Sequence, residues 1–131
     1  MGKGRPEQEG MREDSSMHLV SYAEVVGDSP NTERERERRA LDRSIELLEK
    51  AEAAGSRSTE AVEALAFTGR LWLLLLEGLG RSENALPQEL RADLISVGVW
   101  ILRETDDIRS GKSSNLRAVI DVSKNIRDGL Q

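Results

Sequence analysis

The hydrophobic residues of this chain recur at the spacing of one helix face, and no segment shows the alternation of a strand. The densest stretch is Leu71 to Leu76, which follows Arg70 and contains Trp72. At about 100° per residue, these side chains point to every side of a helix. Other helices of the chain or a partner must therefore cover this stretch. It is far shorter than the roughly 20 residues of a membrane span, so we expect no membrane insertion.

The spacing predicts four main helices and a short N-terminal one. Their predicted ranges are 18–26, 32–54, 58 or 59–78, 87–109, and 113 or 114–130. Gly55 and Ser110-Gly111 are expected to end two of them. The expected starts are Thr32 with Glu35 as a capping box, Ser58 or Thr59, Pro87 in a first helical turn, and Ser113 or Ser114. Short connections make successive helices antiparallel, so the predicted fold is an all-α antiparallel helical bundle.

Each main helix has a stripe expected to face the core. In chain order the stripes are Leu41, Ile45, Leu48 and Ala51 or Glu52; Val62, Leu65, Gly69 and Trp72; Leu90, Leu94, Val97, Gly98 and Ile101; Leu116, Val119, Ile120, Ser123, Ile126 and Leu130. The two glycines each cost roughly 1 kcal/mol of helix propensity relative to alanine. We therefore expect a close helix–helix approach at Gly69 and at Gly98.

The N-terminal segment differs in composition from the rest. Residues 1–17 are rich in Gly, Glu and Arg, and methionine is their one hydrophobic residue type. Such a segment buries too little apolar surface to offset its ordering entropy, so we expect a disordered extension. The remaining residues, 18–131, are long enough for one bundle domain with a core of its own.

The composition excludes some classes of function and disfavours others. The chain has no cysteine, which excludes disulfides and thiolate chemistry and suits a cytoplasmic location. No apolar secretory segment is visible near the N-terminus. The formal net charge is −5, whereas nucleic-acid binding proteins usually carry a basic footprint. Nucleic acid is therefore an unlikely partner.

Catalytic and metal-binding patterns are weak. The one histidine, His18, lies at the edge of the N-terminal extension and is expected to be a bystander. Glu104, Asp106 and Asp107 share one helix, and a solvated face explains them better than a cation site. Neither a metal-ligand spacing nor a phosphate-binding glycine loop is present. We expect no enzyme activity, no metal and no cofactor.

The two tryptophans stand out because aromatic residues make up only 3% of the chain. Trp72 lies on a hydrophobic stripe, which favours the core, with partner contact as the alternative. Trp100 has polar helical neighbours such as Ser96, Arg103 and Glu104. It therefore either packs beneath another segment or contacts a partner, and tryptophan is enriched at binding hot spots.

Several segments, in this order, resemble the FlaF family of bacterial flagellar proteins over roughly residues 19–130. They are the Tyr22 segment with Ser29-Pro30 and Glu35, Arg70-Leu71-Trp72, Leu86-Pro87 with Leu90-Arg91, Leu94 to Trp100, and Val119 to Leu130. The chain departs from the family pattern at two places. Thr68 stands where asparagine is frequent, and Ser123-Lys124-Asn125 replaces a frequent Asn-Arg-Asn.

The resemblance implies a cytoplasmic regulator of flagellum biogenesis that promotes flagellin synthesis or secretion, in opposition to the translational repressor FlbT. It points to an export chaperone that binds flagellin, whose terminal helices are amphipathic, by a helix-in-groove mode. FlbT is a possible second partner. The residues expected to form the partner-binding site are Arg70, Trp72, Leu74, Leu75, Arg91 and Trp100.

Within this site, Leu74 and Leu75 point to different sides of their helix, so both cannot face the core. Trp100 is expected at the rim of the groove, and Arg70 and Arg91 are expected to pair with acidic groups of the bound helix. Two alternatives stay open. One is an RNA-linked post-transcriptional regulator of flagellin expression, and the other is a structural bundle that dimerises through residues 71–76.

Overall fold

The computed structural model describes residues 30–81 and 86–129, all within or between helices. The predicted helix over 18–26, the extension over 1–17 and Leu130 lie outside the described residues. The helices are α2 (Pro30–Ala54), α3 (Thr59–Leu79), α4 (Gln88–Arg109) and α5 (Leu116–Gly129). The chain divides into two units, Met1–Arg36 and Glu37–Gln131, and the packing described here is within the second.

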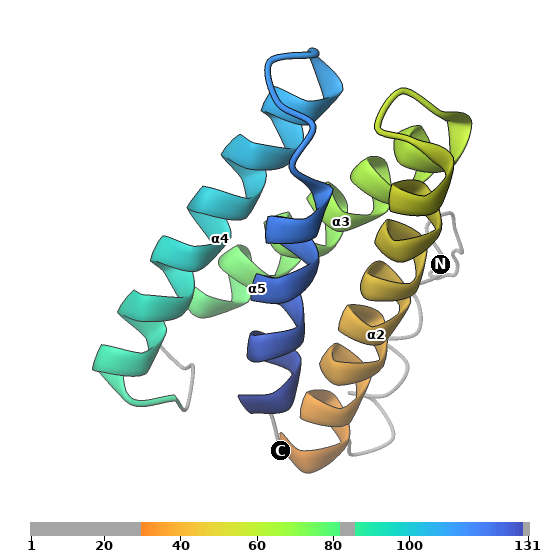
Figure 1. Ribbon diagram of the computed structural model, residues 1–131. Coiled ribbons are helices and arrows are strands. Elements are labelled where there is room, and N and C mark those ends of the chain that lie inside the picture. The colour runs from red at the N-terminus through yellow and green to blue at the C-terminus, as the bar shows by residue number, and fades with distance from the viewer. Residues whose placement is uncertain (1–29, 82–85, 130–131) are drawn as a thin grey trace, which may run out of the picture. The chain divides into compact units, whose positions relative to one another are not determined.

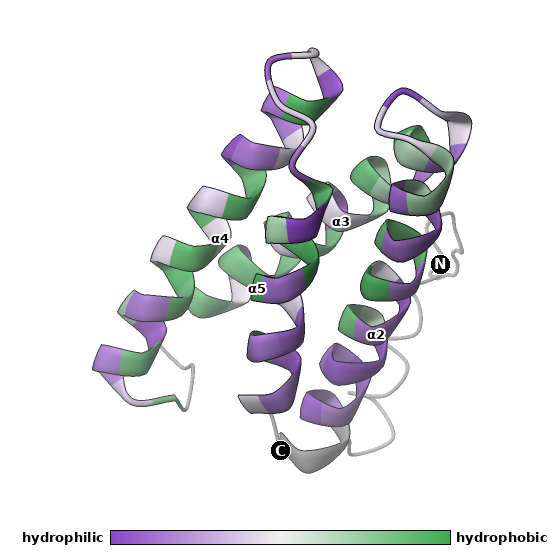
Figure 2. Ribbon diagram, in the orientation of Figure 1, coloured by the Kyte–Doolittle hydropathy of each residue, from purple (hydrophilic) through white to green (hydrophobic). Residues whose placement is uncertain are grey.

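Successive helices run in opposite directions in Figure 1. In this view α5 lies between α2 and α4, and α3 crosses behind them. The predicted all-α bundle of four main helices is therefore confirmed. Figure 2 shows α3 as the most hydrophobic helix, whereas the outward faces of α2 and α5 are hydrophilic. The helix that holds the Leu71–Leu76 stretch packs closely on α4, is joined to α2 by the Ser44–Thr68 hydrogen bond, and shares one hydrophobic core with α5.

The helix ends follow local chemistry. Gly55 follows α2 with a φ of +111°, and Gly111 follows α4 with a φ of +86°. Both glycines adopt the left-handed conformation that commonly ends a helix. The Ser58 hydroxyl accepts a hydrogen bond from the backbone N–H of Ala61 at 3.1 Å, so Ser58 rather than Thr59 caps α3.

Three predicted helix starts are wrong by one to three residues. Helix α2 begins at Pro30, whose fixed φ suits a first turn, so Thr32 lies inside the helix. Pro87 has an extended ψ of 146° and is the N-cap residue of α4. The Asn115 side chain accepts from the N–H of Ala118 at 3.2 Å and caps α5, because Ser113 is engaged with Glu104 at 2.6 Å.

The core contains residues of all four helices. Its buried hydrophobic members include Leu41, Ile45, Leu48, Ala51, Ala61, Ala64, Leu65, Leu71, Trp72, Ile101, Ile108, Leu116, Val119 and Ile120. The predicted stripe of α2 is confirmed, with Ala51 rather than Glu52 in the core. That of α5 is confirmed from Leu116 to Ser123, Ile126 is partly buried, and Leu130 lies outside the described residues. The stripe of α3 was partly wrong: Val62 is 67% exposed, and the buried face runs through Ala61, Leu65, Thr68 and Trp72.

The two mid-helix glycines differ. A Cβ at Gly98 would lie 2.8 Å from Leu76 Cδ2 and 2.9 Å from Trp72 Cε3, so α4 approaches α3 closely there. The expectation for Gly98 is confirmed. A Cβ at Gly69 would meet nothing within 4 Å, so the expectation of close approach at Gly69 is wrong.

The glycine pair gives a direct test of this packing. Replacing either glycine by alanine gains roughly 1 kcal/mol of helix propensity, but Gly98→Ala also adds overpacking strain of about 1–3 kcal/mol. We expect the free energy of unfolding of Gly69→Ala to exceed that of Gly98→Ala by that strain, measured by urea denaturation. Equal stabilisation by the two substitutions would contradict the close approach at Gly98.

Candidate functional site

The core-facing side chains of α4 become more exposed to solvent toward the N-terminal end of the helix. The stripe consists of Leu90, Leu94, Val97, Ile101, Thr105 and Ile108, at consecutive helical spacings of four, three, four, four and three. Its last three residues are buried, the middle two are half-buried, and Leu90 is 44% exposed. One continuous apolar row therefore begins at the surface and ends in the core.

Helix α5 also has apolar side chains that the core covers only in part. Leu116, Val119, Ile120 and Ser123 are buried, whereas Val122 and Ile126 are only partly buried against the core. Helices α4 and α5 lie close together near their connection and separate toward the end of α5 in Figure 1. The surface formed by Leu90, Leu94, Val97, Val122 and Ile126 is called the open apolar face below.

The difference in length between α4 and α5 explains why part of the α4 stripe is exposed. Helix α4 has 22 residues and α5 has 14, so at 1.5 Å per residue they span about 33 Å and about 21 Å. Because both start from the same connection, α5 is too short to follow the whole α4 stripe. Leu90 and Leu94 belong to the part of α4 that extends past this cover.

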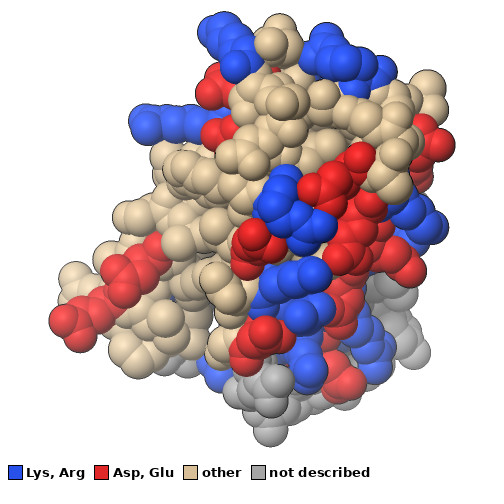
Figure 3. Space-filling view, viewed as in Figure 1, with Lys and Arg blue, Asp and Glu red and all other residues tan. Residues whose placement is uncertain are grey.

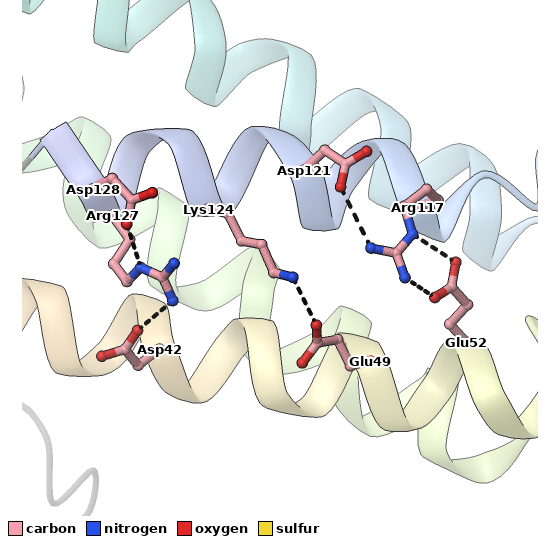
Figure 4. Close-up of polar contacts among 8 residues, drawn as sticks. All are labelled: Asp42, Glu49, Glu52, Arg117, Asp121, Lys124, Arg127 and Asp128. Atoms are coloured by element: carbon pink, nitrogen blue, oxygen red, sulfur yellow. Dashed lines mark hydrogen bonds and ion pairs between the residues drawn. The ribbon is translucent and has the colours of Figure 1, made fainter.

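Ion pairs between α2 and α5 mark the flank of α5 that faces α2. Figure 4 shows that Arg117 contacts Glu52 and Asp121, Lys124 contacts Glu49, and Arg127 contacts Asp42 and Asp128. The Lys124–Glu49 and Arg127–Asp42 distances are 2.9 Å and 3.0 Å. Val122 and Ile126 lie about 160–180° round the helix from Lys124 and Arg117, respectively, and hence on the flank away from α2.

These contacts also raise the pKa of two arginines. The hydrogen bond to Glu52 is the main cause for Arg117, and the hydrogen bond to Asp42 is the main cause for Arg127. The pairs are exposed and each adds little stability, but together they define the side on which α5 meets α2.

The predicted site residues on α3 differ in burial and in the direction they face. Trp72 is 1% exposed and lies in the core, which corrects its inclusion among partner-facing residues. Leu75 packs half-buried against the core, whereas Leu74 is 41% exposed, so the two leucines do face different surroundings. Leu74 is about 160° round the helix from Leu76, which contacts α4 at Gly98, and so points away from α4.

The two predicted arginines have different surroundings. Arg70 is exposed and forms no ion pair with the residues that the structure describes. It shares the flank of Leu74, four residues on, rather than the open apolar face. Arg91 is half-buried, and its guanidinium donates a hydrogen bond to the backbone carbonyl of Arg81 at 3.2 Å. Arg91 is thus tied to the α3–α4 connection.

Trp100 borders the open apolar face. It follows Val97 by three residues on α4, so the two side chains are helical neighbours, and its side chain is 38% exposed. Of the six predicted site residues, Trp100 lies at the edge of this face and Trp72 lies beneath it in the core. Leu90, Leu94 and Val122 were not predicted as site residues. The sequence does hold a signal for them, because its last helix is too short to cover the whole apolar stripe of α4.

Of the residues that depart from the family pattern, Thr68 and Ser123 lie in the core, whereas Lys124 pairs with Glu49 at the surface and Asn125 is exposed. Thr68 and Ser44 share a buried hydrogen bond of 2.6 Å between α3 and α2. The Ser123 hydroxyl and the Trp72 indole N–H are buried without a hydrogen-bond partner among the described residues. Polar groups at positions 68 and 123 therefore act inside the bundle and do not face a partner.

This buried pair supports a second prediction. Thr68→Val keeps the side-chain shape but leaves the Ser44 hydroxyl unpaired, which costs about 1–3 kcal/mol. Adding Ser44→Ala removes the unpaired group, so the double variant should recover much of the lost free energy of unfolding in a denaturation experiment. Additive losses in the double variant would show that the two hydroxyls do not depend on each other.

Other candidate chemistry finds no support in the described ranges. Residues 30–81 and 86–129 hold no group of three or more His, Cys, Asp or Glu able to share a metal ion. Asp106 pairs with Arg109 at 2.9 Å, and Glu104 accepts from Ser113. No described helix is long and apolar enough to cross a membrane.

Fold and surface together define a small helical bundle that leaves part of its core stripe exposed. A family model described as "Flagellar protein FlaF" matches residues 19–130. The chain therefore belongs to the FlaF family of flagellar proteins, which confirms the resemblance seen in its sequence. No curated protein and no solved structure matches it.

Proposed function

We propose that this protein is a flagellin-binding export chaperone of the cytoplasm that promotes flagellin synthesis or secretion, and that its open apolar face receives an amphipathic helix of the client. Membership in a family of flagellar proteins supports the link to flagellin. The observation that carries the proposed site is the gradient along α4, from buried Ile108 to exposed Leu90. A client helix would continue the packing that α5 begins.

The chemistry of the face suits such a client. A helix with apolar residues three and four apart can lay them against Leu90, Leu94 and Val97 on one side and Val122 and Ile126 on the other. Each buried Å² of apolar surface contributes about 25 cal/mol. Because the host residues are already half-buried, the gain per side chain is partial. Binding of this kind is reversible, as release at export requires.

Binding measurements on matched variants test the proposal. Purified flagellin is titrated against the wild-type chain, Leu90→Asp and Val62→Asp. Both substitutions place a carboxylate at an exposed hydrophobic position, but only Leu90 belongs to the open apolar face. We expect Leu90→Asp to weaken binding about tenfold, equivalent to about 1.4 kcal/mol, and Val62→Asp to leave the affinity unchanged.

Circular dichroism and denaturation of each variant provide the folding control. Absence of flagellin binding by the wild-type chain would reject the chaperone function. Equal weakening by both substitutions would reject the site. Light scattering checks the structural alternative: a wild-type dimer that Leu90→Asp converts to a monomer would make this face a self-interface.

A further inference from the structure

A row of polar and aromatic residues borders the open apolar face along α4. Glu89, Asp93, Ser96 and Trp100 follow one another at spacings of four, three and four residues, and all are exposed. They therefore share one flank of the helix. Figure 3 shows acidic side chains over the N-terminal half of α4 beside a broad uncharged surface. The row adds a charged edge to the apolar face.

The two carboxylates of this row have no basic partner within the described part of the chain. Arg91 is the only basic residue in the N-terminal half of α4, and its hydrogen bond goes to the carbonyl of Arg81. Glu89 lies in the first turn, where an acidic residue also stabilises the helix dipole. Asp93 lies beyond that turn, and aspartate is a poor residue for a helix interior, so helix stability does not explain it.

The opposite edge of the face carries no charge. The residues of α5 on the flank away from α2 are Ala118, Val122, Asn125, Ile126 and Gly129. The basic residues Arg117, Lys124 and Arg127 are paired with acidic residues of α2. The open apolar face is thus acidic along α4 and neutral along α5.

We propose that this face selects an amphipathic helix with Lys or Arg along one flank and uncharged residues along the other. The inference rests on the proposed function for the identity of its client, but the surface preference is a property of this chain alone. Basic residues four apart match the spacing of Glu89 and Asp93 and would form ion pairs with them. The exposed ring of Trp100 offers a further contact to a cation at the end of the row.

Two synthetic peptides test this preference without flagellin. Both form amphipathic helices with the same leucine stripe, and one carries Lys where the other carries Glu along a single flank. Binding to the full chain is measured by titration calorimetry at 50 mM and 500 mM NaCl. We expect the Lys peptide to bind at least tenfold tighter in low salt, with the difference shrinking in high salt because exposed charges are screened.

Charge reversal on the protein provides the matched control. Asp93→Lys leaves one carboxylate, Glu89, beside one ammonium group in the row, so it should abolish the preference between the two peptides. Glu63→Lys changes the net charge by the same amount at an exposed position of α3 outside the face, and should leave the preference intact. Equal effects of the two reversals would attribute the preference to net charge and overturn the proposal, as would equal binding, or no binding, of both peptides.

These outcomes separate the two proposals. Flagellin binding that depends on Leu90, combined with no preference between the peptides, would reject the acidic row and leave the chaperone function standing. A clear Lys preference that Asp93→Lys abolishes, in a protein that does not bind flagellin, would support the charge-selective surface and reject flagellin as its client.

Discussion

The contact of Trp72 and Leu76 with Gly98 sets the position of α4 on α3, and the rest of the bundle depends on it. A side chain at position 98 would collide with both residues, so the two helices meet at a point where one has no Cβ. On another flank of α3, the Ser44–Thr68 hydrogen bond joins α2. Helix α5 then covers the remaining side and is held to α2 by its basic flank. This arrangement leaves the N-terminal half of α4 packed on α3 alone, with its side toward α5 uncovered.

The uncovered part of α4 is what distinguishes this bundle from one that encloses its core completely. A closed bundle would need a last helix about as long as α4, whereas α5 has 14 residues against 22. The same row of α4 side chains thus serves two roles. Ile101 and Ile108 stabilise the fold, and Leu90 and Leu94 remain available to a partner. Family membership relates the chain to the flagellum, and the acidic row on α4 gives one edge of the uncovered surface a negative charge.

The sequence predicted much of the fold because most of the helices have one clear apolar side. The cores of α2 and α5 followed from spacing, whereas the helix-propensity cost of glycine predicted the close approach correctly at Gly98 and wrongly at Gly69. Helix α3 was harder, since a stretch apolar on every side does not indicate which face is inward. The small residues Ala61 and Ala64 and the paired Thr68 decide that face, and they exclude Val62. The site was less predictable, because the exposure of Leu90 depends on where α5 ends and separates from α4.

Hydrogen exchange of the chain with and without flagellin tests the central claim most directly, since it reports which helix gains protection. We expect flagellin to slow exchange in the N-terminal half of α4, around Leu90 to Trp100, and in the second half of α5. Exchange in α3 around Val62 should not change. Protection confined to α3, or no change in α4, would contradict the claim that the uncovered stripe of α4 is the binding surface.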